Sequence, residues 1–266
     1  MLSYRVLSAI AGIILFILFV FWGSFPYFLF VSLIAILAAF EYNRLINGDW
    51  YNKYILSFFI LLPLIYTYLR IEGYNLPLGL YLYLILLIFF IINVLIYKKD
   101  SFTIKTGYNI LGFVYIAGGM VFFLLLRNID IEPFGHTKAL WLALITTWIT
   151  DTGAYFIGKF LGNKKLAATI SPNKTVEGAL GGIISSIIAV FLMTTAIGSF
   201  SPRWVLYALL MSILGITGDL FESTLKRDCN VKDSGNIIPG HGGILDRFDS
   251  LLFTVPFTYY FIMYWL

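Results

Sequence analysis

The densest group of ionisable side chains in this chain lies between residues 219 and 250. It comprises acids, bases, a histidine and a serine, namely Asp219, Glu222, Ser223, Lys226, Arg227, Lys232, Asp233, His241, Asp246, Arg247 and Asp249. The surrounding sequence is apolar, since 60% of the chain is hydrophobic and only 12% is charged. Ionisable groups are costly in such a chain, so their clustering predicts a functional site.

Helical spacing places several of these residues on one face. Gly215, Asp219, Ser223 and Lys226 follow one another at intervals of four, four and three residues, which is one stripe along a helix, and Glu222 flanks it. Gly215 would let a ligand or another backbone approach the acid one turn later. An alternative is a purely structural ion pair between Asp219 and Lys226.

The acids of this group predict a metal site. Asp246 and Asp249 are three residues apart at the start of the last apolar segment, so they share a face with each other. Together with Asp219 they form a set of carboxylates without a histidine or cysteine cluster, which favours a hard cation such as Mg²⁺ over zinc. Whether a second cation shares the site is left open.

The bases around these acids predict a polyphosphate ligand. They are Lys226, Arg227, Lys232 and Arg247. The turn formed by residues 239–243 contains His241, Gly242 and Gly243 and could offer backbone N–H groups to phosphate oxygens. Two plainer interpretations stay open: the loop is a solvated connector, and His241 is a turn residue bonded to backbone.

A second polar region lies at residues 151–178. Asp151 interrupts an apolar segment, and Lys159, Lys164, Lys165 and Lys174 follow it. These lysines either hold a triphosphate or attract anionic lipid headgroups. Ser171 and Pro172 predict an N-cap and first helical residue. Three glycines after them, Gly178, Gly181 and Gly182, predict close packing of that helix on a neighbour.

The rest of the chain predicts an all-α integral membrane protein. The mean hydropathy is +0.88, and nine apolar segments are long enough to cross at about 20 residues each. They are residues 6–22, 26–46, 54–69, 77–97, 107–126, 139–157, 176–197, 204–224 and 250–266. Because they leave no room for a soluble domain, we expect residues 1–266 to form a single membrane domain. Residues 1–126 are mainly scaffold, and residues 139–266 carry the catalytic helices and loops.

The basic residues predict the orientation. With nine crossings, only Arg70, Arg127, Lys138 and Arg203 fall on the side opposite the N-terminus, so the N-terminus and the 219–250 group are expected in the cytoplasm. Residues 6–22 are not followed by a small-residue cleavage site, which favours an uncleaved span. No basic tail or nucleic-acid motif is present, so nucleic acid is not an expected partner.

The run S-T-L-K-R-x4-K-D-S-G-N-I-I-P-G-H-G-G-I-L-D-R-F-D at residues 223–249 resembles the signature of phosphatidate cytidylyltransferases, also called CDP-diacylglycerol synthases. DTGAYFIGK at 151–159 and SPNKTVEG at 171–178 resemble a second recurrent region of that family. The resemblance covers about the C-terminal half. It implies that CTP and phosphatidic acid give CDP-diacylglycerol and pyrophosphate with Mg²⁺, the first committed step from phosphatidate to phospholipids.

Roles for individual residues follow from that resemblance together with the spacing. The catalytic group is expected to be Asp219, Ser223, Lys226, Asp246 and Asp249, with Asp219, Asp246 and Asp249 as metal ligands. The expected substrate-binding residues are Arg227, Lys232, His241, Gly242, Gly243, Arg247, Lys159, Lys174 and Asp151. The acyl chains of the lipid are expected to remain in the bilayer.

Two other functions stay open at this point. One is another nucleotide-dependent lipid phosphotransferase, such as a polyprenol kinase; the other is an ion-coupled transporter, because intramembrane acids such as Asp151 often mark ion paths. The D-G-x2-A-R pattern of CDP-alcohol phosphotransferases is absent. We expect a multi-pass protein of a bacterial plasma membrane, surrounded by membrane lipids and assembled as a homodimer.

Overall fold

The computed structural model describes residues 2–46, 48, 52–95, 102–135, 137–238, 240 and 242–266, with side chains from residue 10 onward. The chain divides into two compact units. The first unit contains Met1–Leu125 and Asn236–Ile244, and the second contains Leu126–Gly235 and Leu245–Leu266. The prediction of a single membrane domain stays a prediction.

Each predicted apolar segment is helical over most of its described residues, because a backbone in lipid must satisfy its hydrogen bonds internally. The helices are α1 (Leu2–Trp22), α2 (Ser24–Leu45), α3 (Asn52–Ile71), α4 (Leu78–Leu95), α5 (Phe102–Arg127), α6 (Lys138–Leu161), α7 (Val176–Ala196), α8 (Arg203–Asp228), the single turn α9 (Leu245–Phe248) and α10 (Leu251–Trp265). Within the described residues, α2, α3, α4, α5, α7 and α8 are long and apolar enough to cross a membrane. The chain is therefore a largely helical protein with six candidate spans.

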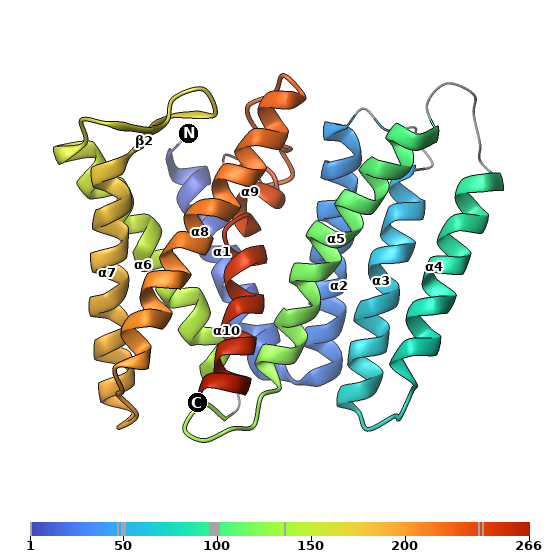
Figure 1. The fold of residues 1–266 in the computed structure, drawn as a ribbon, viewed down its shortest axis with the longest axis horizontal. Helices are drawn as coiled ribbons and strands as arrows, with labels where there is room; N and C mark the ends of the chain where they lie inside the picture. The colour runs from blue at the N-terminus through green and yellow to red at the C-terminus, as the bar shows by residue number, and fades with distance from the viewer. Residues whose placement is uncertain are drawn as a thin grey trace. The chain divides into compact units, whose positions relative to one another are not determined.

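The first unit is held together by aromatic contacts and a few buried hydrogen bonds. Figure 1 shows α2, α3, α4 and α5 running alongside one another in this unit. Phe59 of α3 and Phe89 of α4 meet edge to face, with ring centroids 5.1 Å apart. The Tyr42 hydroxyl of α2 donates to the Tyr108 carbonyl of α5 at 2.9 Å. The expected role of residues 1–126 as a scaffold stays a prediction.

In the second unit, α6, α7, α8 and α10 are joined by buried hydroxyl groups. The Thr147 hydroxyl of α6 bonds Thr254 of α10 at 3.0 Å, and Tyr207 of α8 bonds Thr258 of α10 at 2.9 Å. Ser186 of α7 donates to the Ala208 carbonyl of α8 at 3.1 Å. Hydroxyls of this kind link helices where apolar side chains alone give no preference for protein over lipid.

A β-hairpin connects α6 to α7, where the sequence analysis expected the helix to have begun. Strands β1 (Lys165–Ala167) and β2 (Ser171–Thr175) pair antiparallel. The prediction of an N-cap at Ser171 was wrong, because Thr175 is the N-cap instead and its hydroxyl accepts the Gly178 N–H at 3.1 Å. Pro172 is tolerated because a two-stranded sheet has only edge strands.

The predicted close packing by glycines is confirmed between α6 and α7. A Cβ added to Gly178 would lie 2.8 Å from the Ala154 carbonyl oxygen, and one added to Gly182 would lie 2.9 Å from the Thr150 carbonyl oxygen. At Gly181 it would lie 2.5 Å from the Ile157 side chain. The two helices therefore lie in close contact over about one helical turn, as small residues allow in membrane helices.

Gly182→Ala tests this packing. The new methyl group meets the Thr150 carbonyl, which cannot move without shifting α6, so we expect a loss of about 1–3 kcal/mol in unfolding free energy. The measurement is the thermal unfolding midpoint of detergent-purified protein. Gly118→Ala in α5 is the matched control: a Cβ there has nothing within 4 Å, and alanine favours a helix. Equal midpoints for the two variants would contradict the packing argument.

Candidate functional site

A pocket of about 670 Å³ in the second unit brings together residues from α6, the hairpin, α7, α8 and α9. Its polar lining consists of Asp151, Tyr155, Lys159, Ser171, Asn173, Lys174, Thr175, Asp219, Asp246, Arg247, Asp249 and Ser250. Both polar regions of the sequence therefore meet in one cavity. Of the predicted site residues, Asp151, Lys159, Lys174, Asp219, Asp246, Arg247 and Asp249 line it.

Asp219 lies on α8 and is held from two sides. The Ser223 hydroxyl donates to its Oδ1 at 3.3 Å, which confirms that the two residues share a helical face. Its Oδ2 forms an ion pair with Lys174 of the hairpin. Both side chains stay partly open to solvent, at 34% for Asp219 and 24% for Lys174. The ion pair that was considered between Asp219 and Lys226 is thus replaced by one that joins two elements.

A glycine makes the close approach expected near Asp219, but at a different position. A Cβ on Gly215 would meet only ordinary contacts, the nearest being Thr254 Cγ2 at 3.6 Å. A Cβ on Gly218 would lie 2.6 Å from the Asp249 carbonyl oxygen. Gly218 therefore lets the segment that carries Asp249 lie directly against α8. Gly215 contributes its carbonyl instead, which accepts the Ser250 hydroxyl at 3.0 Å.

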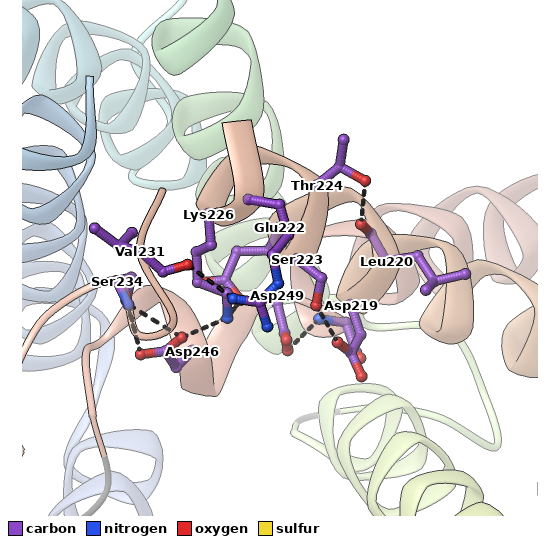
Figure 2. Close-up of polar contacts among 12 residues, drawn as sticks. Asp219, Leu220, Glu222, Ser223, Thr224, Lys226, Val231, Ser234, Asp246 and Asp249 are labelled. Carbon is purple, nitrogen blue, oxygen red and sulfur yellow. Dashed lines mark hydrogen bonds and ion pairs between the residues drawn. The ribbon is translucent and has the colours of Figure 1, made fainter. Parts of the chain in front are cut away.

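Asp246 lies on α9 with hydrogen bonds to both carboxylate oxygens. Lys226 Nζ donates to Oδ1 at 2.7 Å, and Ser234 donates to Oδ2 from its backbone N–H at 3.1 Å and its hydroxyl at 2.9 Å (Figure 2). The carboxylate is thereby fixed in one orientation at the pocket. Ser234 was not among the predicted site residues. The only feature of the sequence that could have indicated it is its position in the K-D-S run.

Lys226 is buried between two acids. Besides Asp246, it donates to Glu222 Oε2 at 2.8 Å, and Glu222 has no exposed surface. Lys226 does not line the pocket among the described residues. Its expected contact with phosphate stays a prediction, while the structure assigns it a place beneath Asp246.

Asp249 follows α9 and is partly buried. The Ser250 N–H donates to its Oδ1 at 2.7 Å. Burial and the negative charge of Asp219 raise the pKa of the Asp249 carboxyl to about 6, although that N–H and nearby lysines act in the opposite direction. A carboxylate beside another carboxylate gains from a cation between them, which is the environment expected of a metal ligand.

The basic residues differ in their relation to the pocket. Lys159 Nζ lies 5.8 Å from the ring centroids of Tyr155 and Phe160. Arg247 is exposed at the pocket edge. Arg227 lies outside the lining and donates to the carbonyls of Ile170 at 3.1 Å and Val231 at 2.9 Å, so it ties the end of α8 to the hairpin turn.

Other predicted residues are not among the described lining residues. Lys232 is exposed and lines no part of this pocket. Gly242 and Gly243 belong to the first unit, where Ile238 N–H donates to the Gly242 carbonyl at 3.0 Å. Gly242 has a φ of 85°, which a glycine adopts without strain. His241 lies outside the described residues, so the phosphate-binding role of this turn stays a prediction.

The acids of the pocket are of the chemical type that binds a hard cation, but the described side chains are not close enough together to coordinate one. Asp151, Asp219, Asp246 and Asp249 all line the pocket and offer only oxygen. Among the described side chains, no three His, Cys, Asp or Glu residues lie close enough together to hold an ion. Lysine ammonium groups pair with Asp219 and Asp246 instead. The donor set therefore fits Mg²⁺ in kind, and a cation there would compete with Lys174.

Comparison with known proteins extends the similarity over the whole chain. The model of the cytidylyltransferase family matches residues 3–265. A phosphatidate cytidylyltransferase of Bacillus subtilis (strain 168) is 36% identical over 270 residues, which is 98% of this chain and 97% of that protein. One of Staphylococcus haemolyticus (strain JCSC1435) is 34% identical over 96% of both chains. The match includes both units of the structure, and the chain belongs to the cytidylyltransferase family.

Proposed function

We propose that this chain transfers a cytidylyl group from CTP to phosphatidic acid, which gives CDP-diacylglycerol and pyrophosphate. The observation that carries the proposal is the pocket in which four aspartates meet Lys159, Lys174 and Arg247. Full-length similarity to phosphatidate cytidylyltransferases supports the choice of substrates. In the reaction, an oxygen of the lipid phosphate attacks the α-phosphorus of CTP, and the bond to the β-phosphate breaks.

Charge is the main obstacle to this reaction. Phosphatidic acid is a phosphate monoester with about −1.5 to −2 charges near neutral pH, so its oxygen needs little deprotonation. It must approach a triphosphate that is also strongly anionic. Lys159, Lys174 and Arg247 line the same pocket and would neutralise both reactants while holding them in line.

We propose Asp219, Asp246 and Asp249 as the residues that would hold Mg²⁺. When bound, the ion supplies positive charge to the phosphates of the nucleotide and to the leaving pyrophosphate. Ser223 donates to Asp219 and would fix the orientation of that ligand. Asp151 of α6 lines the same pocket and would add negative charge for the same cation.

The lipid would reach this pocket from the bilayer. Tyr155 and Phe156 of α6 and Leu180 of α7 expose apolar side chains near the pocket residues of their helices. We propose that nine helices cross the plasma membrane, that the N-terminus and the pocket face the cytoplasm, and that acyl chains stay in the lipid. The basic loops expected on that side support this orientation.

A reconstituted assay tests the proposed activity. Purified protein in mixed micelles is given labelled CTP, phosphatidic acid and Mg²⁺, and the products are separated by solvent extraction. We expect a lipid-soluble cytidine product and one pyrophosphate for each, with no product when EDTA is added. Formation of CDP together with a lipid that has gained one phosphate would instead indicate a kinase.

Asp219→Asn and Asp246→Asn test the ligand assignment. Each removes one carboxylate charge with little change of shape, so we expect turnover to fall at least about a hundredfold. Thermal unfolding midpoints check that both variants fold. Asp228→Asn is the matched control, because Asp228 is exposed on the same helix and outside the pocket lining. Normal Mg²⁺-dependent turnover in both pocket variants would refute the assignment.

The lysines of residues 159–174 fall into two groups, those that line the pocket and those that do not. Lys159 and Lys174 line the pocket, whereas Lys164 and Lys165 do not. Lys159→Gln and Lys174→Gln should each raise the KM for CTP about tenfold, because each loses a charged contact to phosphate. Lys165→Gln should leave it unchanged. If the pocket variants raise the KM for phosphatidic acid alone, these lysines hold the lipid headgroup rather than the nucleotide.

A further inference from the structure

Three charged side chains form a largely buried chain of contacts that ends at a residue of the pocket lining. Glu222 Oε2 accepts from Lys226 Nζ at 2.8 Å, and the same Nζ donates to Asp246 Oδ1 at 2.7 Å. Glu222 has no exposed surface, and the Lys226 side chain is 11% exposed. Figure 2 shows these contacts, and of the three residues Asp246 is the member that lines the pocket.

This arrangement is hard to explain by stability alone. Burying a charged pair costs about as much desolvation energy as the attraction returns, so a buried ion pair is weak evidence for a stabilising role. Glu222 also leaves Oε1 buried with no hydrogen-bond partner in the described part of the chain. An apolar residue at position 222 would avoid both costs. The presence of a carboxylate at position 222 must therefore be explained by its effect on the neighbouring residues.

The charge of the three residues supplies that reason. Lys226 and Ser234 together hold Asp246 in one orientation, but the lysine alone would also cancel the negative charge of Asp246. The negative charge of Glu222 offsets the positive charge of Lys226, because the Glu222 carboxylate lies in contact with the Lys226 ammonium group. With all three side chains ionised, the group carries one net negative charge, and Asp246 is the member that lines the pocket.

We propose that Glu222 is a positioning residue of this site: it offsets the charge of Lys226, so that Lys226 can orient Asp246 without neutralising it toward a divalent cation. This inference rests on the proposed function, since it takes Asp246 as a cation ligand. It extends that function by assigning a task to a buried residue that does not line the pocket.

Mn²⁺ binding to the detergent-purified protein tests the proposal without turnover. Free Mn²⁺ is followed by electron paramagnetic resonance during titration, with no nucleotide or lipid substrate present. Glu222→Gln keeps the shape of the side chain and removes its charge, so the Kd for Mn²⁺ should rise at least about tenfold. Asp228→Asn removes an exposed carboxylate from the same helix and should leave the Kd unchanged.

A double variant separates charge balance from simple disruption. Glu222→Met with Lys226→Met removes both buried charges, a type of replacement that helical proteins often tolerate. Asp246 then regains its own charge, so the Kd for Mn²⁺ should return to within about threefold of the unsubstituted protein. A role of Glu222 in packing alone predicts no such recovery. If Glu222→Gln does not fold, the double variant still decides the question.

The outcomes distinguish this inference from the proposed function. An unchanged Kd in Glu222→Gln, or a double variant that folds but binds weakly, would overturn the role of Glu222. Asp246→Asn is measured alongside and should lose most Mn²⁺ affinity. If Asp246→Asn binds as well as the unsubstituted protein, the ligand assignment itself is wrong, whatever Glu222 does.

Discussion

The site of this protein depends on one constraint: acids placed in an apolar helical unit must lie beside positive charge. Water is scarce there, and an isolated buried carboxylate is costly. The second unit meets the constraint by pairing Asp219 with Lys174 and Asp246 with Lys226. Each pair joins different elements, so the same contacts that make the acids tolerable also assemble the walls of the pocket.

The constraint links catalysis to binding. The two reactants of the proposed reaction are anions, and the pocket presents lysines and an arginine beside the aspartates. A site built only of bases would hold both substrates but could not take a divalent cation. A site built only of acids would repel them. In the proposed reaction, this mixture would let a cation, a triphosphate and a lipid phosphate share one cavity of about 670 Å³.

Much of this could be predicted from sequence because the signals are local. Continuous apolar runs predicted every helix except the single turn α9, and an interval of four residues placed Ser223 beside Asp219. The contact between Asp219 and Lys174 could not be predicted, since 45 residues of chain separate them and no periodicity relates them. The hairpin was missed for another reason: Ser171 and Pro172 also suit a helix start, and the hydroxyl of Thr175 caps α7 instead. Gly218 was overlooked in favour of Gly215 because a close approach depends on the partner backbone, here that of Asp249.

The glycine contacts between α6 and α7 have a consequence for how a ligand is accommodated. Where two backbones touch, there are no side chains that could rotate to enlarge the space beside them. The wall formed by α6, which carries Asp151 and Lys159, is therefore expected to be rigid. Adjustment to the size of an incoming molecule would then fall to the two-stranded hairpin, which contacts α8 through the Arg227 side chain and through the ion pair between Lys174 and Asp219.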